Sequence, residues 1–428
     1  MANYDFNVDG FFYEILDGTK NVAVVREKYF SQRPYSGEIR IPETVIFDGE
    51  TYKVTEIGQQ LFSHCTEITK VFIPAGVTSI HTVAFSGCTG LTDVYISDGL
   101  AEIADFAFYD CTGLRNFHVS DANAVYCDID GVLFSKDKTK LVLYPQNGKV
   151  PGYKIPESVR TIGEYAFGHC IGLTDVDIPD SVTEIERSAF YGCRGLTEMS
   201  IPDSVTQIGG NIFCQCRRLR SIHVAENNPA YCDIDGVLYS KDREKLIEFP
   251  SAYATEYNIP EGVRSIGAFA FCDCNSLTNV NIPDSVTEIG FSAFDRCFGL
   301  TEVDIPDSVT KIESQAFMQC HGLSEIIIPE GVTEIGHMAF CDCDNLRNVV
   351  IGVNVRTIRE HAFYDCRRLH SIICVAQKPP RLEREVFPRE IDVRRRHDEH
   401  ITLAVPFGSV DAYRSDREWG MFEDISGL

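Results

Sequence analysis

The chain is built from a repeated pattern of apolar and polar positions. One copy runs from Leu300 to Cys320, and its frame reads L-x-x-V-x-I-P-x-x-V-x-x-I-x-x-x-A-F-x-x-C. Aligned copies are spaced by 23 residues within each run, and they begin at Leu173, Leu196, Leu277, Leu300, Leu323, Leu346 and Leu369. A fixed period of this size predicts a solenoid, in which each coil buries its apolar edge against the next.

The pattern inside one copy predicts the elements of each coil. In the copy that begins at Leu196, Met199 and Ile201 alternate with polar residues, which is typical of a half-buried strand. Pro202 interrupts the strand, and the Asp-Ser pair after it favours a turn. A second short apolar segment follows. We expect the closing Ala-Phe-x-x-Cys to form a single helical or 3₁₀ turn, with its Phe and Cys pointing inward.

Cysteines keep the same period as the leucines. Eleven of the 17 occupy the last position of the frame: Cys65, Cys88, Cys111, Cys170, Cys193, Cys216, Cys274, Cys297, Cys320, Cys343 and Cys366. In a parallel stack their Cβ vectors run parallel, whereas a disulfide needs them to face each other. We therefore expect buried free thiols that act as small apolar fillers. Cys214, Cys272 and Cys341 add C-x-C pairs, a poor match to zinc spacing, so the sequence predicts no metal and no cofactor.

Two insertions interrupt the period, near residues 120–150 and 225–256. They resemble each other closely: AVYCDIDGVLFSKDKTKLVLYP in the first and AYCDIDGVLYSKDREKLIEFP in the second. Each predicts a β-hairpin, with Val132–Ser135 paired to Leu141–Tyr144 across a Lys-Asp-Lys tip in the first. The Asp-x-Asp-Gly segment that begins at Asp128, and its counterpart in the second insertion, fit either a plain turn or a weak calcium loop. The plain turn is favoured because the third acid and the bidentate Glu of an EF-hand are missing.

The two ends of the chain depart from the repeat. Residues 1–56 contain three Asp-Gly turns, at Asp9, Asp17 and Asp48, between strand-like flanks, which predicts a β-rich N-terminal cap. The repeats then occupy 57–374. We expect residues 375–428 to form a C-terminal cap.

Within the C-terminal cap, the pattern predicts a strand at 401–405 and a helical turn at 409–414. Trp419 is expected to pack with Phe422 onto the last coil. The basic run Arg394–Arg396 has two interpretations, a solvated loop or a site for an acidic partner.

Composition narrows the class of partner. The net charge is −24 with a sequence pI near 4.8, which argues against nucleic acid and anionic membranes as partners. Apolar residues make up 44%, enough to bury a core. No apolar run is long enough for a membrane-spanning helix, and the first residues lack the pattern of a secretory signal. We expect a monomer with no membrane insertion, whose partner is a protein.

Motifs for catalysis are missing from the sequence. It contains no H-E-x-x-H, no G-x-S-x-G and no phosphate-binding glycine loop. His64, His169 and His321 lie near repeat cysteines, but not at one repeated offset, so we interpret them as surface histidines. The sequence predicts that the protein is not an enzyme.

The units IPDSVTEIG and AFxxC, the IDGVLFSKDKTKL insertion and the closing LAVPFGSVDAYR together resemble the BspA-like leucine-rich repeat proteins, also called the Treponema pallidum type. The resemblance covers nearly the whole chain, caps included. It implies a right-handed solenoid with a parallel sheet on its concave side. It also implies a secreted or cell-surface protein of bacteria such as the Bacteroidetes, associated with adhesion to host matrix proteins and bacterial co-aggregation. The family shares no ligand-binding residues that could be carried over.

The outward positions of the leading strands form the candidate partner-binding stripe, which consists of Asp93, Tyr95, Asp175, Asp177, Glu198, Glu302, Asp304 and Glu325. Stacking should place equivalent residues about 4.8 Å apart, and like charges opposite each other destabilise a sheet. The stripe is either a copied, solvent-screened face or an electrostatic surface for a basic partner or weakly held cations. Lysines near Lys136 and Lys241 on the insertions are the alternative surface.

These observations favour a non-enzymatic protein-binding or adhesion scaffold that recognises host or bacterial proteins at a cell surface. An intracellular interaction scaffold that uses the same surface is the alternative. A glycan-binding or glycan-acting protein is a weaker one, because the exposed strand positions are mostly acidic or small, with Tyr95 the main exception.

Overall fold

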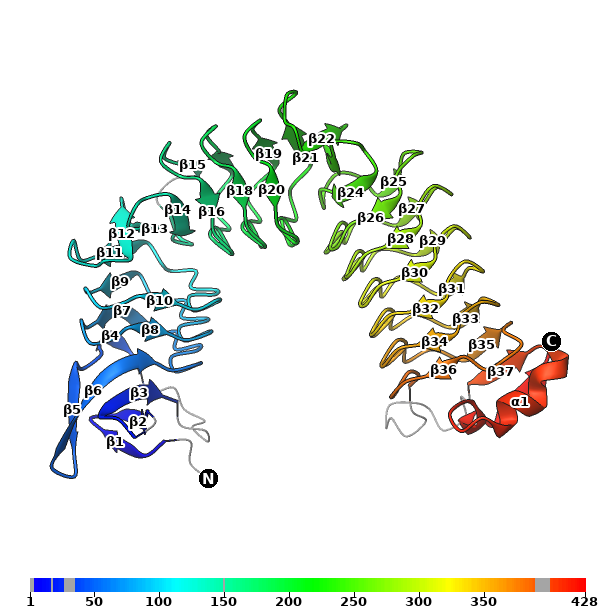
Figure 1. Cartoon of the computed structure of the whole chain (residues 1–428), viewed down its shortest axis with the longest axis horizontal. Coiled ribbons are helices and arrows are strands. Elements are labelled where there is room, and N and C mark those ends of the chain that lie inside the picture. The colour runs from blue at the N-terminus through cyan, green and yellow to red at the C-terminus, as the bar shows by residue number, and fades with distance from the viewer. Residues whose placement is uncertain (1–3, 17, 27–34, 149–150, 389–400) are drawn as a thin grey trace. The chain divides into compact units, whose positions relative to one another are not determined.

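The computed structural model describes residues 4–16, 18–26, 35–148, 151–388 and 401–428 (Figure 1). The chain divides into two compact units. Unit 1 comprises residues 1–197 and 204–216, and unit 2 comprises 198–203 and 217–428. Each unit is a β-solenoid with β-hairpins added to it, and each is described by itself below.

The coil from Leu300 to Cys320 shows how the repeat folds. β29 (Glu302–Asp304) buries Val303 and exposes its two acids, and a second strand, β30 (Lys311–Ile312), buries Ile312. Each strand pairs in parallel with the equivalent strand of a neighbouring coil, 23 residues away. The predicted strand is confirmed. The second apolar segment is also a strand, which the pattern did not indicate.

The predicted helical turn at Ala-Phe-x-x-Cys is wrong. In this coil Gln315 and Gln319 adopt left-handed φ values of 60° and 58°. The backbone N–H of Phe317 donates to Ala339 O at 2.7 Å and that of Gln319 to Cys341 O at 2.8 Å, both in the next coil. A helix would need these N–H groups for its own carbonyls. The segment is therefore a series of tight turns hydrogen-bonded from coil to coil.

Phenylalanine rings stack along the core of each unit. In unit 2, adjacent centroids lie 4.7 to 5.5 Å apart in the series Phe271, Phe294, Phe317, Phe340, Phe363 and Phe387. The repeat cysteines line the same core as free thiols, as predicted. They also do more than fill space, because Cys320 Sγ donates to Phe294 O at 3.2 Å and Cys343 Sγ donates to Phe317 O at 3.2 Å.

The start of unit 1 consists of antiparallel hairpins that lead into parallel stacking. Asp9-Gly10 and Asp48-Gly49 turn with positive φ, as the sequence predicts, whereas the turn predicted at Asp17 lies outside the described residues. The first sheet follows the order β1-β2-β3-β6-β8-β10, with β5 on β6. Its strands are β1 (Phe6–Val8), β2 (Phe11–Ile15), β3 (Asn21–Val25), β5 (Thr44–Phe47), β6 (Glu50–Ile57), β8 (Ser79–Ile80) and β10 (Glu102–Ile103).

Each coil contributes a leading strand and a second short strand, and in the rest of unit 1 these two kinds of strand stack in separate sheets. The sheet β11-β9-β7-β4 comprises β4 (Gly37–Arg40), β7 (Ile68–Ile73), β9 (Asp93–Ile96) and β11 (Asn116–Val119). The sheet β12-β13-β14-β16-β18-β20 comprises β12 (Tyr126–Ile129), β13 (Val132–Ser135), β14 (Lys140–Leu143), β16 (Thr161–Ile162), β18 (Glu184–Ile185) and β20 (Gln207–Ile208). β15 (Gly152–Lys154) pairs with β17 (Asp175–Asp177).

The first insertion forms the predicted hairpin. β13 pairs antiparallel with β14, in a register that places Phe134 opposite Leu141. Asp130 and Gly131 have φ values of 52° and 86°, as a tight two-residue hairpin turn requires, so the Asp-Gly segment is a turn. One further strand, β12, precedes the turn and makes a three-stranded meander. The second insertion repeats this arrangement in unit 2.

The described residues of unit 2 form four sheets. One has the order β22-β23-β24-β26-β28-β30-β32-β34-β36, and its strands besides β30 are β22 (Tyr231–Ile234), β23 (Val237–Ser240), β24 (Lys245–Glu248), β26 (Ser265–Ile266), β28 (Glu288–Ile289), β32 (Glu334–Ile335), β34 (Thr357–Ile358) and β36 (Arg381–Leu382). The leading strands of the coils form the other three sheets. In the first, β19 (Glu198–Ile201) pairs with β21 (Ser221–Val224), and the second comprises β25 (Glu256–Asn258), β27 (Asn279–Asn281) and β29. The third comprises β31 (Glu325–Ile328), β33 (Asn348–Ile351), β35 (Ser371–Cys374), β37 (Thr402–Val405) and β38 (Asp424–Gly427).

The end of unit 2 agrees with the expected C-terminal elements. The predicted strand is β37, and the helical turn is α1 (Val410–Ser415), flanked by the 3₁₀ turns η1 (Phe407–Ser409) and η2 (Trp419–Met421). The ring of the buried Trp419 has its centroid 6.0 Å from that of Phe422 and 5.7 Å from that of Phe387 in the last coil, as predicted. The arginine run falls outside the described residues. The boundaries proposed for caps and solenoid, 1–56, 57–374 and 375–428, stay a prediction.

Candidate functional site

The part of the candidate stripe on unit 1 differs from the expectation that its residues face freely outward. Asp93 Oδ1 accepts hydrogen bonds from Asn116 Nδ2 at 3.0 Å and lies 3.0 Å from His118 Nε2, and Thr92 Oγ1 donates to Asp93 Oδ2 at 2.8 Å. Burial acts to raise the pKa of Asp93, but these hydrogen bonds outweigh it and hold the pKa below its ordinary value. Asp93 is thus tied into the sheet surface.

Tyr95 also belongs to a packed arrangement. Its ring stacks at 4.5 Å on Phe72 and at 4.5 Å on His118, and the Arg40 guanidinium lies 3.7 Å from the Phe72 centroid. Both faces of the Tyr95 ring are therefore covered. A sugar-binding platform needs an open aromatic face, so Tyr95 does not provide one. Phe72, Tyr95 and His118 follow one another at intervals of 23 residues, so the period of the repeat could have predicted this column.

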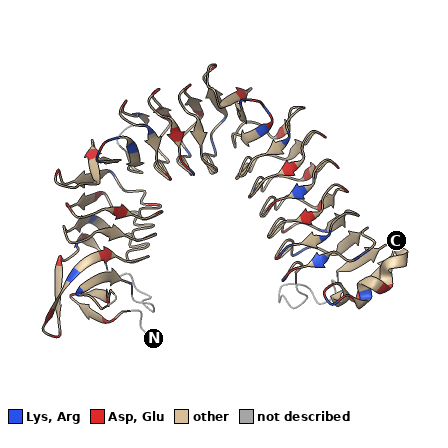
Figure 2. Cartoon of the chain, viewed as in Figure 1, with Lys and Arg blue, Asp and Glu red and all other residues tan. Residues whose placement is uncertain are grey.

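The acids of the stripe do not lie opposite other acids in the paired strands. In unit 1, Asp175 is in register with Gly152 and Asp177 with Lys154, whose Nζ lies 3.7 Å from Asp177 Oδ2. In unit 2, the register partners of Glu198, Glu302, Asp304 and Glu325 are Ser221, Asn279, Asn281 and Asn348. The expected repulsion between stacked acids is relieved in these pairs, and Figure 2 shows basic as well as acidic residues along the strands of unit 2.

An apolar column continues the acidic positions of unit 2. Glu302, Asp304 and Glu325 are exposed on β29 and β31, which contact each other. At the position that Asp304 holds on β29, the next strand carries Ile327, which is 55% exposed. Ile327 is in register with Val350, which in turn is in register with Ile373, and both of these are half-buried.

We call Glu302, Asp304, Glu325, Ile327, Val350 and Ile373 the acidic–apolar face. Its acids were predicted from the sequence, whereas its apolar members were not included in the stripe. The signal was present, because the outward positions of β31, β33 and β35 break the polar alternation. One exposed isoleucine that continues into two half-buried apolar side chains, beside exposed carboxylates, gives this face the mixed apolar and charged character of a protein-interaction surface.

The three histidines near repeat cysteines do not share one environment. His64 is exposed and His321 is half-buried. His169 is buried, which corrects its assignment to the surface. Its ring lies edge-on to Tyr109 with centroids 4.5 Å apart, and burial lowers the pKa of His169. The neutral imidazole acts there as a core side chain of unit 1.

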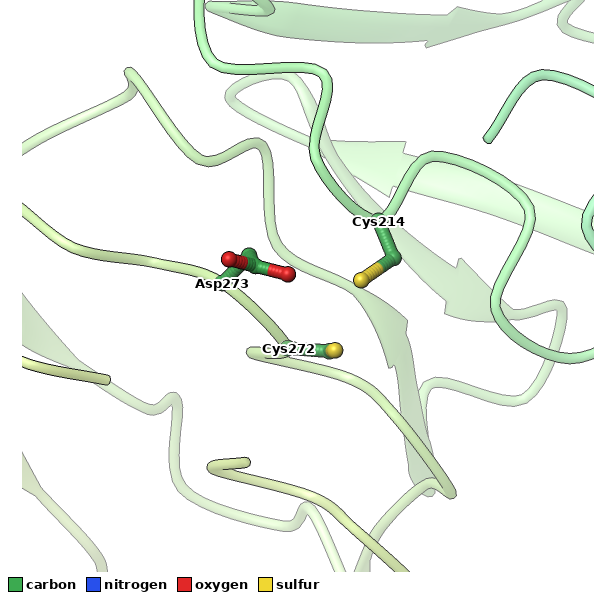
Figure 3. A group of neighbouring side chains, drawn as sticks. All are labelled: Cys214, Cys272 and Asp273. Carbon is green, nitrogen blue, oxygen red and sulfur yellow. The ribbon is translucent and has the colours of Figure 1, made fainter. Parts of the chain in front are cut away.

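The cysteines of the C-x-C pairs are buried and belong to no disulfide. In unit 2, Cys272 and Asp273 are neighbours in one turn (Figure 3), and Arg296 Nε lies 3.6 Å from Asp273 Oδ2. Cys214, also labelled in Figure 3, belongs to unit 1 and is equally buried. Cys274 Sγ points to the core and donates to Phe249 O at 3.7 Å.

Among the described residues, no helix has the length and apolar character to cross a bilayer.

Comparison with known proteins identifies the family. Six copies of the BspA type leucine rich repeat region match residues 16–139, 143–233 and 247–370. A leucine rich cell surface protein from Faecalibacterium prausnitzii is 31% identical, with a TM-score of 0.55, over 87% of this chain and 94% of that protein. The pneumococcal vaccine antigen PcpA has the same fold, at 20% identity and a TM-score of 0.54, over 98% of this chain and 96% of that chain. No curated protein matches. The chain belongs to the BspA-type leucine-rich repeat family.

Proposed function

We propose that the protein is a non-enzymatic adhesion scaffold, secreted or at the cell surface, which binds host or bacterial proteins. The observation that carries this proposal is the acidic–apolar face of unit 2. A solenoid presents such a face on a rigid row of strands, so a partner meets a preformed surface. The description of the Faecalibacterium relative as a cell surface protein supports the location.

The chemistry of this face defines the partner. Glu302, Asp304 and Glu325 offer carboxylates in water, where they steer a basic partner but contribute little affinity by themselves. Ile327 and the side chains beside it supply apolar area that is lost to water on binding. A partner with lysine or arginine residues next to an exposed apolar segment fits both features.

The test is a binding screen of the purified chain against host matrix proteins, intact bacteria and glycans, followed by kinetics on the strongest partner. The variant Ile327→Ser should raise the dissociation rate. The double variant Glu302→Gln and Asp304→Asn should slow association, and this effect should shrink as salt rises.

Two matched controls lie outside the face. Ile171→Ser removes another isoleucine that is 51% exposed, and Glu288→Gln neutralises an exposed acid on β28. Both should bind as the wild type does. If the face variants bind with unchanged rates at low salt, this face is not the binding surface, and the hairpin insertions near Lys136 and Lys241 become the next candidates.

An intracellular interaction scaffold is the second candidate, and the cysteines favour it. None of the 17 is placed in a disulfide, which is the state that a reducing compartment maintains. Fractionation of the native cells decides between the two locations. Recovery in the cytosolic fraction would overturn the surface location and leave the binding face as proposed.

A further inference from the structure

Two neighbouring turns of unit 2 bring three metal-binding side chains together. His337 follows β32, and Glu360 and His361 follow β34. Each offers a ligand atom within 4.8 Å of the others, and all three side chains are half-buried. His337 and Glu360 are separated by 23 residues, which is the length of one coil, so they hold the same position in adjacent coils.

Backbone geometry fixes these positions. Met338 and His361 adopt φ values of 55° and 59°, as the equivalent residues of earlier coils do. Met338 N donates to Glu360 O at 3.1 Å, and His361 N donates to Arg384 O at 3.1 Å. The coils are therefore locked in register at this point, and the stacking fixes the backbone positions from which the three side chains extend.

His361 is oriented by an acid in the next coil. Its Nε2 lies 3.1 Å from Glu385 Oε2, so the ring donates its N–H there. Its Nδ1 is then the lone-pair nitrogen, and it is buried without a hydrogen-bond partner among the described residues. A carboxylate that holds one nitrogen of an imidazole while the other stays free is the usual arrangement around a metal-binding histidine.

Two arginines lie near the site. Arg384 Nε lies 3.7 Å from Oε1 of Glu385, whose other oxygen holds His361. The Arg359 guanidinium bridges Glu334 at 2.9 Å and Glu383 at 2.7 Å. In the two preceding coils the positions of His337 and Met338 are held by Ser314 and Gln315, and by Phe291 and Ser292. The two preceding coils thus lack the imidazoles that His337 and His361 bring to this column.

We propose that His337, Glu360 and His361 bind a divalent transition-metal ion such as Zn²⁺, with Glu385 as the positioning residue for His361. Two imidazoles and one carboxylate are a frequent zinc ligand set that leaves one coordination position open. Ligand atoms around tetrahedral zinc are about 3.3 Å apart, given bonds of about 2.0–2.1 Å. The ligand atoms lie within 4.8 Å of one another, so each pair must approach by at most roughly 1.5 Å to reach this spacing. Rotamer adjustment of the half-buried side chains provides such a movement.

The fourth position is available to water or to a donor group of a partner protein. The ion would join two coils on a surface outside the acidic–apolar face. This site is independent of the proposed adhesion function, so either can fail without the other.

Calorimetric titration of the reduced chain with ZnCl₂ alone tests the proposal. The wild type should take up one ion per chain with micromolar or better affinity. His337→Ala and His361→Ala should weaken binding by 100-fold or more, and Glu385→Gln by about 10- to 100-fold, as loss of an outer carboxylate does. The control His370→Ala removes an exposed histidine of the same unit and should leave binding unchanged.

Two further measurements separate this site from thiols and from misfolding. Co²⁺ bound by the wild type should show visible absorption without thiolate charge transfer, because no cysteine is among the ligands. Glu360→Gln keeps the size of the side chain, and it should lose affinity while retaining the wild-type circular dichroism spectrum. Absence of micromolar uptake, equal binding by the His337→Ala and His361→Ala variants, or a thiolate band in the Co²⁺ spectrum would each overturn the proposal.

Discussion

Removal of one ring from the phenylalanine stack tests how the solenoid is held together. Phe294 is 0% exposed and lies between Phe271, at 4.7 Å and 9° between ring planes, and Phe317, at 5.0 Å and 3°. The variant Phe294→Ala removes the ring from two contacts at once. It also leaves a cavity shared by neighbouring coils, which the backbone bonds between coils prevent from collapsing.

The magnitude follows from these contacts. A buried Phe→Ala change costs about 3–5 kcal/mol in the free energy of unfolding. Each stacked aromatic pair contributes about 0.5–1.5 kcal/mol within that total, and Phe294 loses two pairs. We therefore expect about 4–5 kcal/mol, in the upper part of the range. Since coils interact only with their neighbours, the loss should also weaken cooperativity between the two sides of the gap.

Guanidinium unfolding followed by two probes measures both effects. Circular dichroism reports on the sheets, and fluorescence reports on Trp419, the only tryptophan, at the end of unit 2. The matched control is Phe298→Ala in the same coil, because Phe298 is 38% exposed and, among the described rings, stacks on His321 alone, with centroids 5.0 Å apart. The control should cost about 1 kcal/mol or less. Equal midpoints for Phe294→Ala and the control would show that the ring stack does not stabilise the solenoid.

Three further results are expected. Burial raises the pKa of Glu248 well above its ordinary value, so the folded state favours the protonated carboxyl; the stability that this gives is complete below the unfolded-state pKa and is lost as pH rises through the folded-state pKa. The variant Glu248→Leu copies Leu143 of the first insertion, so it should raise the free energy of unfolding at pH 7 and make that free energy less dependent on pH. A lower unfolding midpoint would contradict this. Because the pKa of Asp93 is lowered in the fold, its carboxylate stabilises the folded state above the unfolded-state pKa, and this stabilisation is lost as pH falls through the folded-state pKa. The variant Asp93→Asn should therefore lose less stability than the wild type on acidification. The same dependence of the unfolding midpoint on acidic pH in both proteins would argue against this role. A thiol reagent should modify at most the half-buried Cys127 and Cys232 in the native protein and all 17 cysteines after unfolding without reductant, whereas paired cysteines would leave the count short.

The period of the chain was sufficient to predict the solenoid. Leu300, Val303 and Phe317 recur every 23 residues with polar residues between them, and only stacking buries such a pattern. Asp130-Gly131 likewise predicted a turn, because that pair tolerates positive φ. These features depend on local conformation and on the burial of periodic side chains, and both can be read along a single chain.

The turns after the second strand of each coil could not be predicted in this way. Phe317 and Gln319 satisfy their N–H groups in the next coil, so contacts 22 residues away decide against a helix that local sequence alone permits. The same holds for His169, whose burial follows from Tyr109 and from the coil that packs over it.

The candidate sites were decided by what stacking places side by side. The acids of the stripe are visible in the sequence, but strand pairing decides which residues lie in register with them, such as Asn281 beside Asp304. His337 and Glu360 stand one period apart, yet their closeness to His361 and the role of Glu385 depend on side-chain directions. The sequence determines which residues share a column, and the tertiary structure decides which of them face each other, because register and rotamer are set by packing between coils.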